Sequence, residues 1–178
     1  MSTAAKILPY YTYEDYLHWE GRWELIDGIP YAMSPLPVPK HQRIVADLIR
    51  SFGNELTQYE NCRVYAPLDY RVLDDTVLQP DVLIVCGEIE KKYLDFPPAL
   101  VVEILSPCTA LKDRHTKFSI YEGQGIRYYL IISQNTEEVE VYEIERGAYV
   151  LRQKAHAFRH EFTFDTCPVT VDFNQIWE

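Results

Sequence analysis

The chain has 178 residues, of which 47% are hydrophobic and 25% are charged, and its formal net charge at pH 7 is −10. This composition is ordinary for a folded protein with a core of its own, and it excludes a disordered or low-complexity chain. The first residues lack the continuous apolar stretch of a signal peptide, and no window is apolar enough for a membrane span, so we expect a cytoplasmic protein without membrane contact.

Local sequence signals define the elements of the first half of the chain. Acidic residues near the start of the first helix indicate its N-terminus. Asp27-Gly28 between two strand-like runs is a strong hairpin signal, and apolar residues at every fourth position from Ile44 to Leu56 give the long helix a buried stripe. The predicted elements are a helix over 10–20, a hairpin of strands over 22–26 and 29–33, a loop over 34–39, a helix over 40–59, and strands over 63–66 and 70–73.

The second half of the chain alternates between apolar strands and one helix. Continuous apolar runs indicate strands that are buried on both faces, and Gly125 is a typical stop for the helix before it. The predicted elements are strands over 79–86 and 99–105, a helix over 109–124, and strands over 127–133, 138–144 and 148–153. This order predicts an α/β fold, a mixed central sheet flanked by helices, in a single domain over residues 1–178.

The four cysteines, Cys62, Cys86, Cys108 and Cys167, show no metal-binding or disulfide pattern. None of them forms a C-x-x-C pair, so a structural zinc site is not expected. Disulfides are not expected either, because no secretory signal accompanies the cysteines. We therefore predict that Cys62 and Cys86, which lie in apolar surroundings, are reduced thiols in the core.

Two acidic residues stand where a buried strand normally carries apolar side chains. Glu103 lies inside the apolar run 99–105, and Asp81 opens the apolar run 82–86. An ionised carboxylate that is buried without a partner is costly, so such a residue pairs with a cation or binds a metal. Carboxylates are the oxygen ligands that Mg²⁺ prefers, and the backbone carbonyl of Ile104 is a candidate third ligand.

A polar stripe follows Glu103 on the next helix. Asp113, Lys117 and Tyr121 are spaced by four residues, so an α-helix presents them on one side. The connection through Ser106-Pro107 can fold this stripe back toward Glu103. An ammonium group beside a metal can orient the attacking water and offset charge on a phosphoryl group.

These residues together resemble the PD-(D/E)XK nuclease superfamily and, within it, the Uma-type bacterial "putative restriction endonuclease" family. The similarity extends over residues 13–142. One position departs from the superfamily pattern, because Leu105 stands where a lysine would follow the glutamate, and Lys117 on the following helix takes that place in the Uma-type pattern. The segments that carry the resemblance are Glu24-Leu25-Ile26-Asp27-Gly28, His41, Pro80-Asp81, Glu103-Ile104-Leu105-Ser106-Pro107, Asp113-Arg114, Lys117 and Tyr121.

The resemblance implies a restriction-endonuclease-like α/β fold and a Mg²⁺- or Mn²⁺-dependent endonuclease that hydrolyses phosphodiester bonds in DNA. Asp81 and Glu103 would hold the metal, and Lys117 would position or activate water. A homodimer is expected, because two sites related by a twofold axis can cut both strands of a duplex. Four further residues are candidates for the wall of the active site, namely Glu24, His41, Asp113 and Tyr121.

Each candidate also has a purely structural alternative. Glu24 on a hairpin strand can face solvent, and His41 can make a polar contact at its helix start. Asp113 can serve as a helix charge or as a partner of Lys117, and Tyr121 can be a packing residue with a solvated hydroxyl. For Glu103 the alternative is a buried acid that pairs with an arginine or is capped by backbone N–H groups.

Two other functions stay open at this point. The first is a catalytically inactive nuclease-fold module that binds nucleic acid or a protein partner. The acidic net charge favours it, because phosphate backbones attract basic surfaces, and so does the displaced lysine. The second is an assembly protein that pairs the alternating strand 138–142 with another chain.

Overall fold

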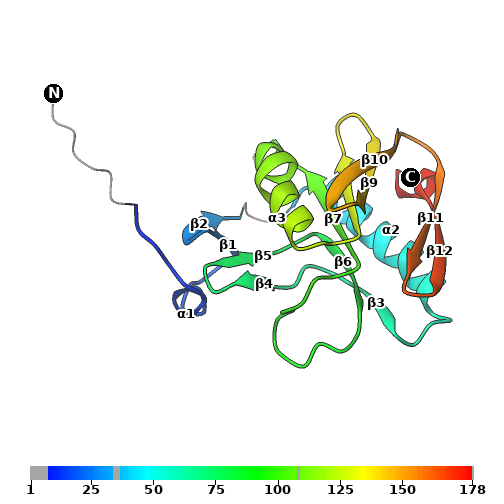
Figure 1. The fold of residues 1–178 in the computed structure, drawn as a ribbon. Helices are drawn as coiled ribbons and strands as arrows, with labels where there is room; N and C mark the ends of the chain where they lie inside the picture. The colour runs from blue at the N-terminus through cyan, green and yellow to red at the C-terminus, as the bar shows by residue number, and fades with distance from the viewer. Residues whose placement is uncertain (1–7, 34–36, 108, 178) are drawn as a thin grey trace.

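A six-stranded mixed sheet forms the centre of the computed structural model, which describes residues 8–33, 37–107 and 109–177 (Figure 1). Its strands are β3 (Cys62–Tyr65), β6 (Val82–Cys86), β7 (Leu100–Leu105), β8 (Tyr128–Ser133), β9 (Glu138–Glu145) and β10 (Ala148–Ala155). The spatial order is β10-β9-β8-β7-β6-β3. β7 and β8 run parallel and the other neighbours run antiparallel, so the sheet is mixed as the sequence predicts.

Two smaller sheets complete the β-structure. One has the order β2-β1-β5-β4 and follows the short helix α1 (Tyr13–Tyr16); the other is the hairpin of β11 and β12, followed by the 3-10 helix η2 (Phe173–Ile176). The predicted Asp27-Gly28 turn joins β1 to β2. The strands are β1 (Trp23–Ile26), β2 (Ile29–Ala32), β4 (Tyr70–Leu73), β5 (Thr76–Leu78), β11 (Arg159–Phe164) and β12 (Cys167–Asp172).

The two faces of the central sheet are covered by different elements. Helix α2 (Pro39–Leu56) and the β11–β12 hairpin pack on one face, where Val102 and Ile104 of β7 join their apolar core. Val101 and Leu105 belong to the core on the other face, with Tyr121 of helix α3 (Phe118–Gly123). Because strand side chains alternate, Glu103 points to this second face.

The structure confirms the predicted α/β class, and it differs from the sequence expectations in detail. The sequence does not predict β5, β11, β12 or η2. β5 has three residues, and β11 and β12 bury their alternate apolar residues only because the hairpin packs against α2. The helix expected over 10–20 is limited to α1, and the first part of the helix expected over 109–124 is a π-helix, η1 (Lys112–Lys117).

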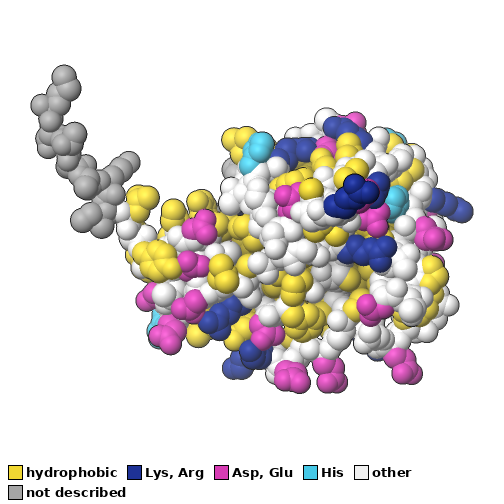
Figure 2. Space-filling model, viewed as in Figure 1, with side chains coloured by type: hydrophobic (Ala, Val, Ile, Leu, Met, Phe, Trp, Pro, Cys, Tyr) yellow, Lys and Arg dark blue, Asp and Glu magenta, His cyan; other side chains and the backbone are white. Residues whose placement is uncertain are grey.

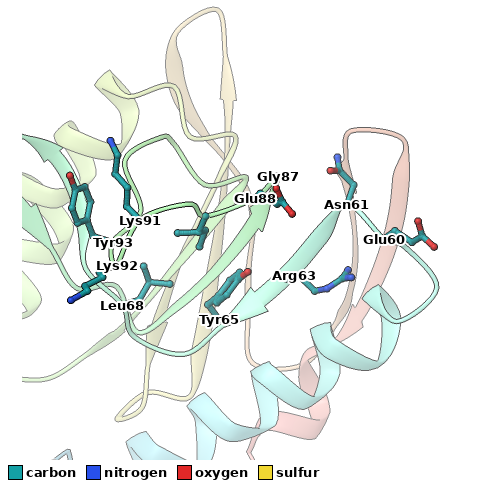
Figure 3. Close-up of a pocket in the computed structure, with 11 residues that line it drawn as sticks. Glu60, Asn61, Arg63, Tyr65, Leu68, Gly87, Glu88, Lys91, Lys92 and Tyr93 are labelled. Carbon is teal, nitrogen blue, oxygen red and sulfur yellow. The ribbon is translucent and has the colours of Figure 1, made fainter.

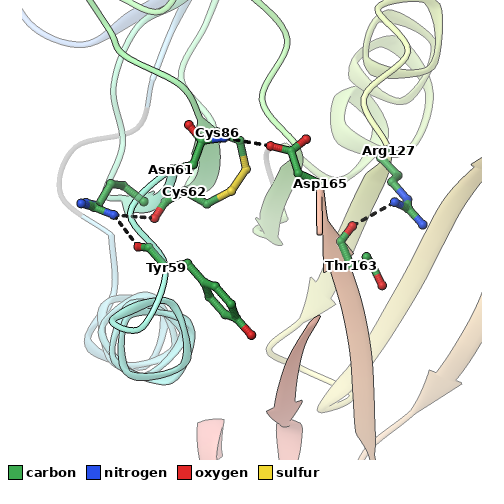
Figure 4. Close-up of a disulfide and its surroundings, with 8 residues drawn as sticks. Tyr59, Asn61, Cys62, Cys86, Arg127, Thr163 and Asp165 are labelled. Carbon is green, nitrogen blue, oxygen red and sulfur yellow. Dashed lines mark hydrogen bonds between the residues drawn. A yellow bond between two sulfur atoms is a disulfide. The ribbon is translucent and has the colours of Figure 1, made fainter. Parts of the chain in front are cut away.

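The expectation of reduced core thiols at Cys62 and Cys86 is wrong, because the two residues form a disulfide (Figure 4). They are 24 positions apart in the sequence, but the antiparallel register of β3 and β6 places them directly opposite each other, with Cα atoms 4.0 Å apart. Strand register is a tertiary property that cysteine spacing does not reveal. Cys108 lies outside the described residues, and so do positions 34–36 of the predicted loop.

The strand proposed for assembly is not available for that purpose. β9 contains residues 138–142 and pairs along its length with β8 on one side and with β10 on the other. Its backbone groups are therefore used within the chain, and pairing with a second copy would require β10 to leave. Among the described helices, none is long and apolar enough to cross a membrane.

Candidate active site

Asp81 lies directly before β6 and is fixed to β7 on both sides of Glu103. Its N–H donates to the carbonyl of Val102 at 3.1 Å, and its Oδ2 accepts the N–H of Ile104 at 2.8 Å. The main chain of β7 thus holds the Asp81 carboxylate next to Glu103. The fold places the two predicted metal ligands side by side at the end of two paired strands.

His41 reaches the same carboxylate from the first turn of α2. Its Nε2 lies 3.3 Å from Oδ2 of Asp81, and the ring is buried. Its Nδ1 is also buried and has no hydrogen-bond partner among the described residues. The position at the helix start is the one expected from the sequence, and the contact to Asp81 connects α2 with the site.

Glu103 is 3% exposed and is held by two residues of the following helix. Lys117 Nζ lies 2.8 Å from its Oε1, and the hydroxyl of Tyr121 donates to the same oxygen at 2.7 Å. In the described part of the chain the cationic partner of Glu103 is this lysine and not the arginine of one structural alternative. The hydroxyl of Tyr121 is buried on this carboxylate rather than solvated, so the side chain does more than pack.

Glu24 of β1 is fully buried and therefore does not face solvent, which was its structural alternative. Its Oε1 lies 2.7 Å from Lys117 Nζ and accepts the N–H of Gln79 at 3.1 Å. Its Oε2 accepts a hydrogen bond from Lys112. Both oxygens of Glu24 are thus occupied by the protein, and the residue anchors two lysines.

The π-helical winding of η1 explains why two lysines meet at Glu24. A π-helix bonds each residue to the fifth along the chain, so Lys112 and Lys117 lie on one side of it. Asp113 lies beside them, almost fully buried, with Oδ1 3.4 Å from Lys117 Nζ. Sequence reasoning missed Lys112, because positions five apart do not share a side in an α-helix.

The charges of the cluster shift the protonation of its members in different directions. Burial raises the pKa of Glu103 well above its usual range; Lys117 opposes this shift, and the charges of Asp113, Asp81 and Glu24 add to it. Burial also raises the pKa of Glu24, but Lys117 and Lys112 together bring it below the usual value. The pKa of Asp113 is raised, chiefly by burial.

Lys117 stays protonated in this setting. Its burial alone would lower the pKa of the ammonium, but the carboxylates of Glu103, Glu24 and Asp113 raise it well above the usual value. The cluster holds the four carboxylates of Asp81, Glu24, Glu103 and Asp113 against the two ammonium groups of Lys112 and Lys117. With all four carboxylates ionised, negative charge would exceed positive charge in this largely buried place, and the raised pKa values of Glu103 and Asp113 oppose that ionisation.

Two carboxylates of the cluster, Asp81 and Glu103, offer the oxygen donors that a hard divalent cation takes. Both hydrogen bonds to Glu103 go to Oε1, and the polar contacts of Asp81 go to Oδ2, which leaves a second oxygen on each carboxylate. The Oδ1 of Asp113 is buried without a hydrogen bond among the described residues. Carboxylate oxygens with surplus negative charge are the environment in which Mg²⁺ or Mn²⁺ binds.

A surface hollow lies apart from the carboxylate cluster. A hollow of about 600 Å³ between the β3 edge and the loop after β6 is lined by residues that include Arg63, Tyr65, Lys91 and Tyr93 (Figure 3). None of the clustered carboxylates lines it. On the face drawn in Figure 2, Lys and Arg side chains are scattered among Asp and Glu rather than joined in one basic surface.

Three comparisons relate the chain to known proteins. The family model Uma2, described as "Putative restriction endonuclease", matches residues 13–168. An uncharacterized protein of Synechocystis is 33% identical over 138 residues, which is 72% of each chain. A crystal structure of a "putative nuclease belonging to DUF820" from Anabaena variabilis has a TM-score of 0.75 at 16% identity and covers 93% of this chain and 97% of that chain. At this identity the structural likeness shows the fold alone.

Proposed function

The chain belongs to the Uma2 "Putative restriction endonuclease" family, as its motifs predict, and on this premise we propose that it is a divalent-metal-dependent DNA endonuclease. The observation that carries the proposal is the surplus of carboxylates over ammonium groups in this cluster. Lys117 Nζ lies within 2.8 Å of Glu103 and 2.7 Å of Glu24, with Asp81 fixed beside Glu103. Buried carboxylates in excess of their cationic partners are costly, and a bound metal ion would offset that cost.

Asp81 and Glu103 would hold the metal through their free oxygens, and the backbone carbonyl of Ile104 would supply a third. A bound Mg²⁺ or Mn²⁺ would polarise a phosphoryl oxygen and lower the pKa of a water molecule. The strands β6 and β7 fix both carboxylates in advance, so little reorganisation would accompany metal binding. His41 would keep Asp81 in the orientation that the Ile104 N–H already favours.

In the superfamily pattern a lysine on the strand supplies a positive charge at the position that is Leu105 here. Lys117 on η1 would supply that charge in this chain. Leu105 shares the face of Glu103 but has no polar group, and the ammonium of Lys117 reaches the same carboxylate from η1. In this position it would orient water and offset the charge that develops on the phosphoryl group. Glu24 and Tyr121 would act as positioning residues, since they hold Lys117 and Glu103 respectively.

The experiment that tests the proposal is a nuclease assay on supercoiled plasmid and on single-stranded oligonucleotides, with Mg²⁺ or Mn²⁺ and with EDTA. Asp81→Asn should remove cleavage. Asp47→Asn is the matched control, because Asp47 is as exposed as Asp81 (15% against 13%) but pairs with Arg50 on α2. Cleavage that persists in EDTA or in Asp81→Asn would refute the proposed role of the metal.

The oligomeric state is a separate proposal. A homodimer would bring two sites to the two strands of a duplex, and sedimentation equilibrium of the full chain measures it directly. A monomer that still cuts single strands would leave the endonuclease proposal intact and refute the dimer.

The inactive binding module remains the second candidate, and one observation favours it. Lys117 is 2% exposed and is shared among carboxylates, so its ammonium is not free in the protein alone. A protein that binds DNA in a gel-shift assay, binds no Mn²⁺ in calorimetry and cuts no substrate would support this function instead.

A further inference from the structure

A layer of tyrosines lies between the central sheet and the helical segment formed by η1 and α3. The rings pack edge to face or tilted against one another and against Phe118. Each hydroxyl donates to a different acceptor. The pairs are Tyr121 with Glu103, Tyr129 with the carbonyl of Asp113, Tyr142 with Glu140, and Tyr149 with the carbonyl of Ile126.

Tyr129 is the member of this layer that joins the sheet to η1 itself. It is fully buried on β8, opposite Val101 of β7, and so points to the same face as Glu103. Its hydroxyl donates to the backbone carbonyl of Asp113 at 2.9 Å. The phenol thus spans the distance between the strand next to Glu103 and the π-helical turn that carries Lys117.

This support matters because π-helical winding is unfavourable by itself. Such turns are rare, occur mostly as single turns inside α-helices and are frequent at functional sites. In η1 the winding brings Lys112 and Lys117 to Glu24 while Lys117 also reaches Glu103. A relaxation to α-helical winding would rotate these side chains relative to one another and move the ammonium of Lys117 from its carboxylates.

We propose that Tyr129 is a positioning residue. Its hydrogen bond holds η1 at the distance from the sheet that allows Lys117 to contact Glu103. The inference rests on the proposed function only for its activity readout, since the placement of the ammonium can be measured without any substrate. The hydroxyl of Tyr129 donates to the Asp113 carbonyl and, among the described residues, to none of the carboxylates, so its effect would pass through that carbonyl.

The test compares Tyr129→Phe with Tyr149→Phe. Both changes remove one hydroxyl that donates to a backbone carbonyl, at 2.9 Å and 2.8 Å respectively, but Ile126 lies beyond α3 and outside η1. The first readout is proton exchange of the Lys117 ammonium in ¹⁵N-lysine spectra, assigned with Lys117→Met. The buried ammonium of the parent should exchange slowly, as should that of Tyr149→Phe, and Tyr129→Phe should exchange faster.

The second readout is the split between kcat and KM. We expect Tyr129→Phe to lower kcat by about 10²-fold with little change in KM or in Mn²⁺ affinity, which is the size of effect that a small misplacement produces. Tyr149→Phe should keep kcat. Both variants should lose thermal stability to a similar extent, so that stability alone does not separate them.

Two results distinguish the failure of this inference from the failure of the proposed function. A parent protein without nuclease activity refutes the function, and the exchange of the Lys117 ammonium still decides the role of Tyr129. If Tyr129→Phe and Tyr149→Phe have the same ammonium exchange, Tyr129 is a packing residue and the inference is overturned.

Discussion

Glu103 and Glu140 are two buried glutamates on the same face of the central sheet, two strands apart. The strand registers connect them in one row, in which Glu103 is next to Ile131 and Ile131 is next to Glu140. Both accept a tyrosine hydroxyl, and both are contacted by a cation from η1. Similar positions in the fold therefore hold the same residue type in two different electrostatic settings.

The difference lies in the charges around each carboxylate. Arg114 binds both oxygens of Glu140, at 2.9 and 3.0 Å, and Lys154 lies 3.1 Å away, so two cations serve one acid. The pKa of Glu140 is lowered to about 2, because its hydrogen bonds and the charge of Arg114 outweigh burial. Burial raises the pKa of Glu103, and the single lysine that opposes this shift is shared with two other carboxylates.

This comparison separates a structural ion pair from a site that has room for a further cation. Glu140 fixes η1 to β9 and has no need of another positive charge. Glu103 stands in a cluster with surplus negative charge, which is the condition for binding a divalent metal. Substitutions at Glu103 or at Glu140, or at the lysine partner of either, should therefore have different effects.

The largest expected effect is on metal binding and cleavage. Glu103→Gln should abolish both, and so should Asp81→Asn, because each removes one of the two proposed metal ligands. Glu140→Gln should retain Mn²⁺ binding, although it removes an equally buried strand carboxylate. Calorimetric titration with Mn²⁺ and a plasmid assay measure these effects, and Mn²⁺ affinity in Glu103→Gln equal to that of the parent would show that Glu103 is not a ligand.

The next effect concerns the lysine partners of the two glutamates. Lys117→Met should bind Mn²⁺ and lose roughly 10²–10³ in kcat, about 2.7–4 kcal/mol, as expected for the loss of one preorganised charge. Lys117→Arg should restore little, since a planar guanidinium does not place its charge where an ammonium does. Lys154→Met is the control on Glu140 and should leave kcat unchanged, and an equal loss in both variants would contradict the assignment.

The two glutamates should also have opposite effects on stability in metal-free buffer. Glu140→Gln should lower the free energy of unfolding by about 1–3 kcal/mol, because Arg114 loses a charged acceptor. Glu103→Gln should raise the melting temperature, because it removes one of several carboxylates that repel each other in a buried place. Urea unfolding and calorimetry test this, and a loss of stability in both variants would contradict it.

The smallest effect is the pH dependence of stability. Glu140 has a folded pKa of about 2 against a usual 4.5, so its contribution is complete above pH 4.5 and is lost as the pH falls toward 2. Glu103 has a raised pKa, so its contribution is complete below pH 4.5 and is lost as the pH rises through the folded pKa. The free energy of unfolding of the parent minus that of Glu140→Gln should therefore rise with pH. The same difference for Glu103→Gln should fall with pH.

Much of the fold follows from local sequence patterns. The Asp27-Gly28 turn, the apolar stripe of α2 and the apolar runs of β6 and β7 each predict an element that the structure contains. The same patterns single out Asp81 and Glu103, because an acid in an apolar strand is visible without any tertiary information. The alternation of β7 also gives the face on which Glu103 lies.

Other features depend on contacts between distant segments and could not be predicted. The disulfide between Cys62 and Cys86 requires the register of β3 against β6. The burial of β11 and β12 depends on α2, which packs against the hairpin and covers its apolar side chains. Glu24 stands on a short hairpin strand, and its burial becomes apparent only when the four-stranded sheet lies against η1.

The sequence by itself determined which residues are available for chemistry, because residue type and strand periodicity are local properties. Only the tertiary structure decided how their charges are shared. The π-helical winding of η1 places both Lys112 and Lys117 in contact with Glu24. Glu103 contacts Lys117, which also contacts Glu24 and Asp113. The protonation of a buried carboxylate depends on every charge within a few ångströms, and the chain brings these charges together from β1, β6, β7 and η1.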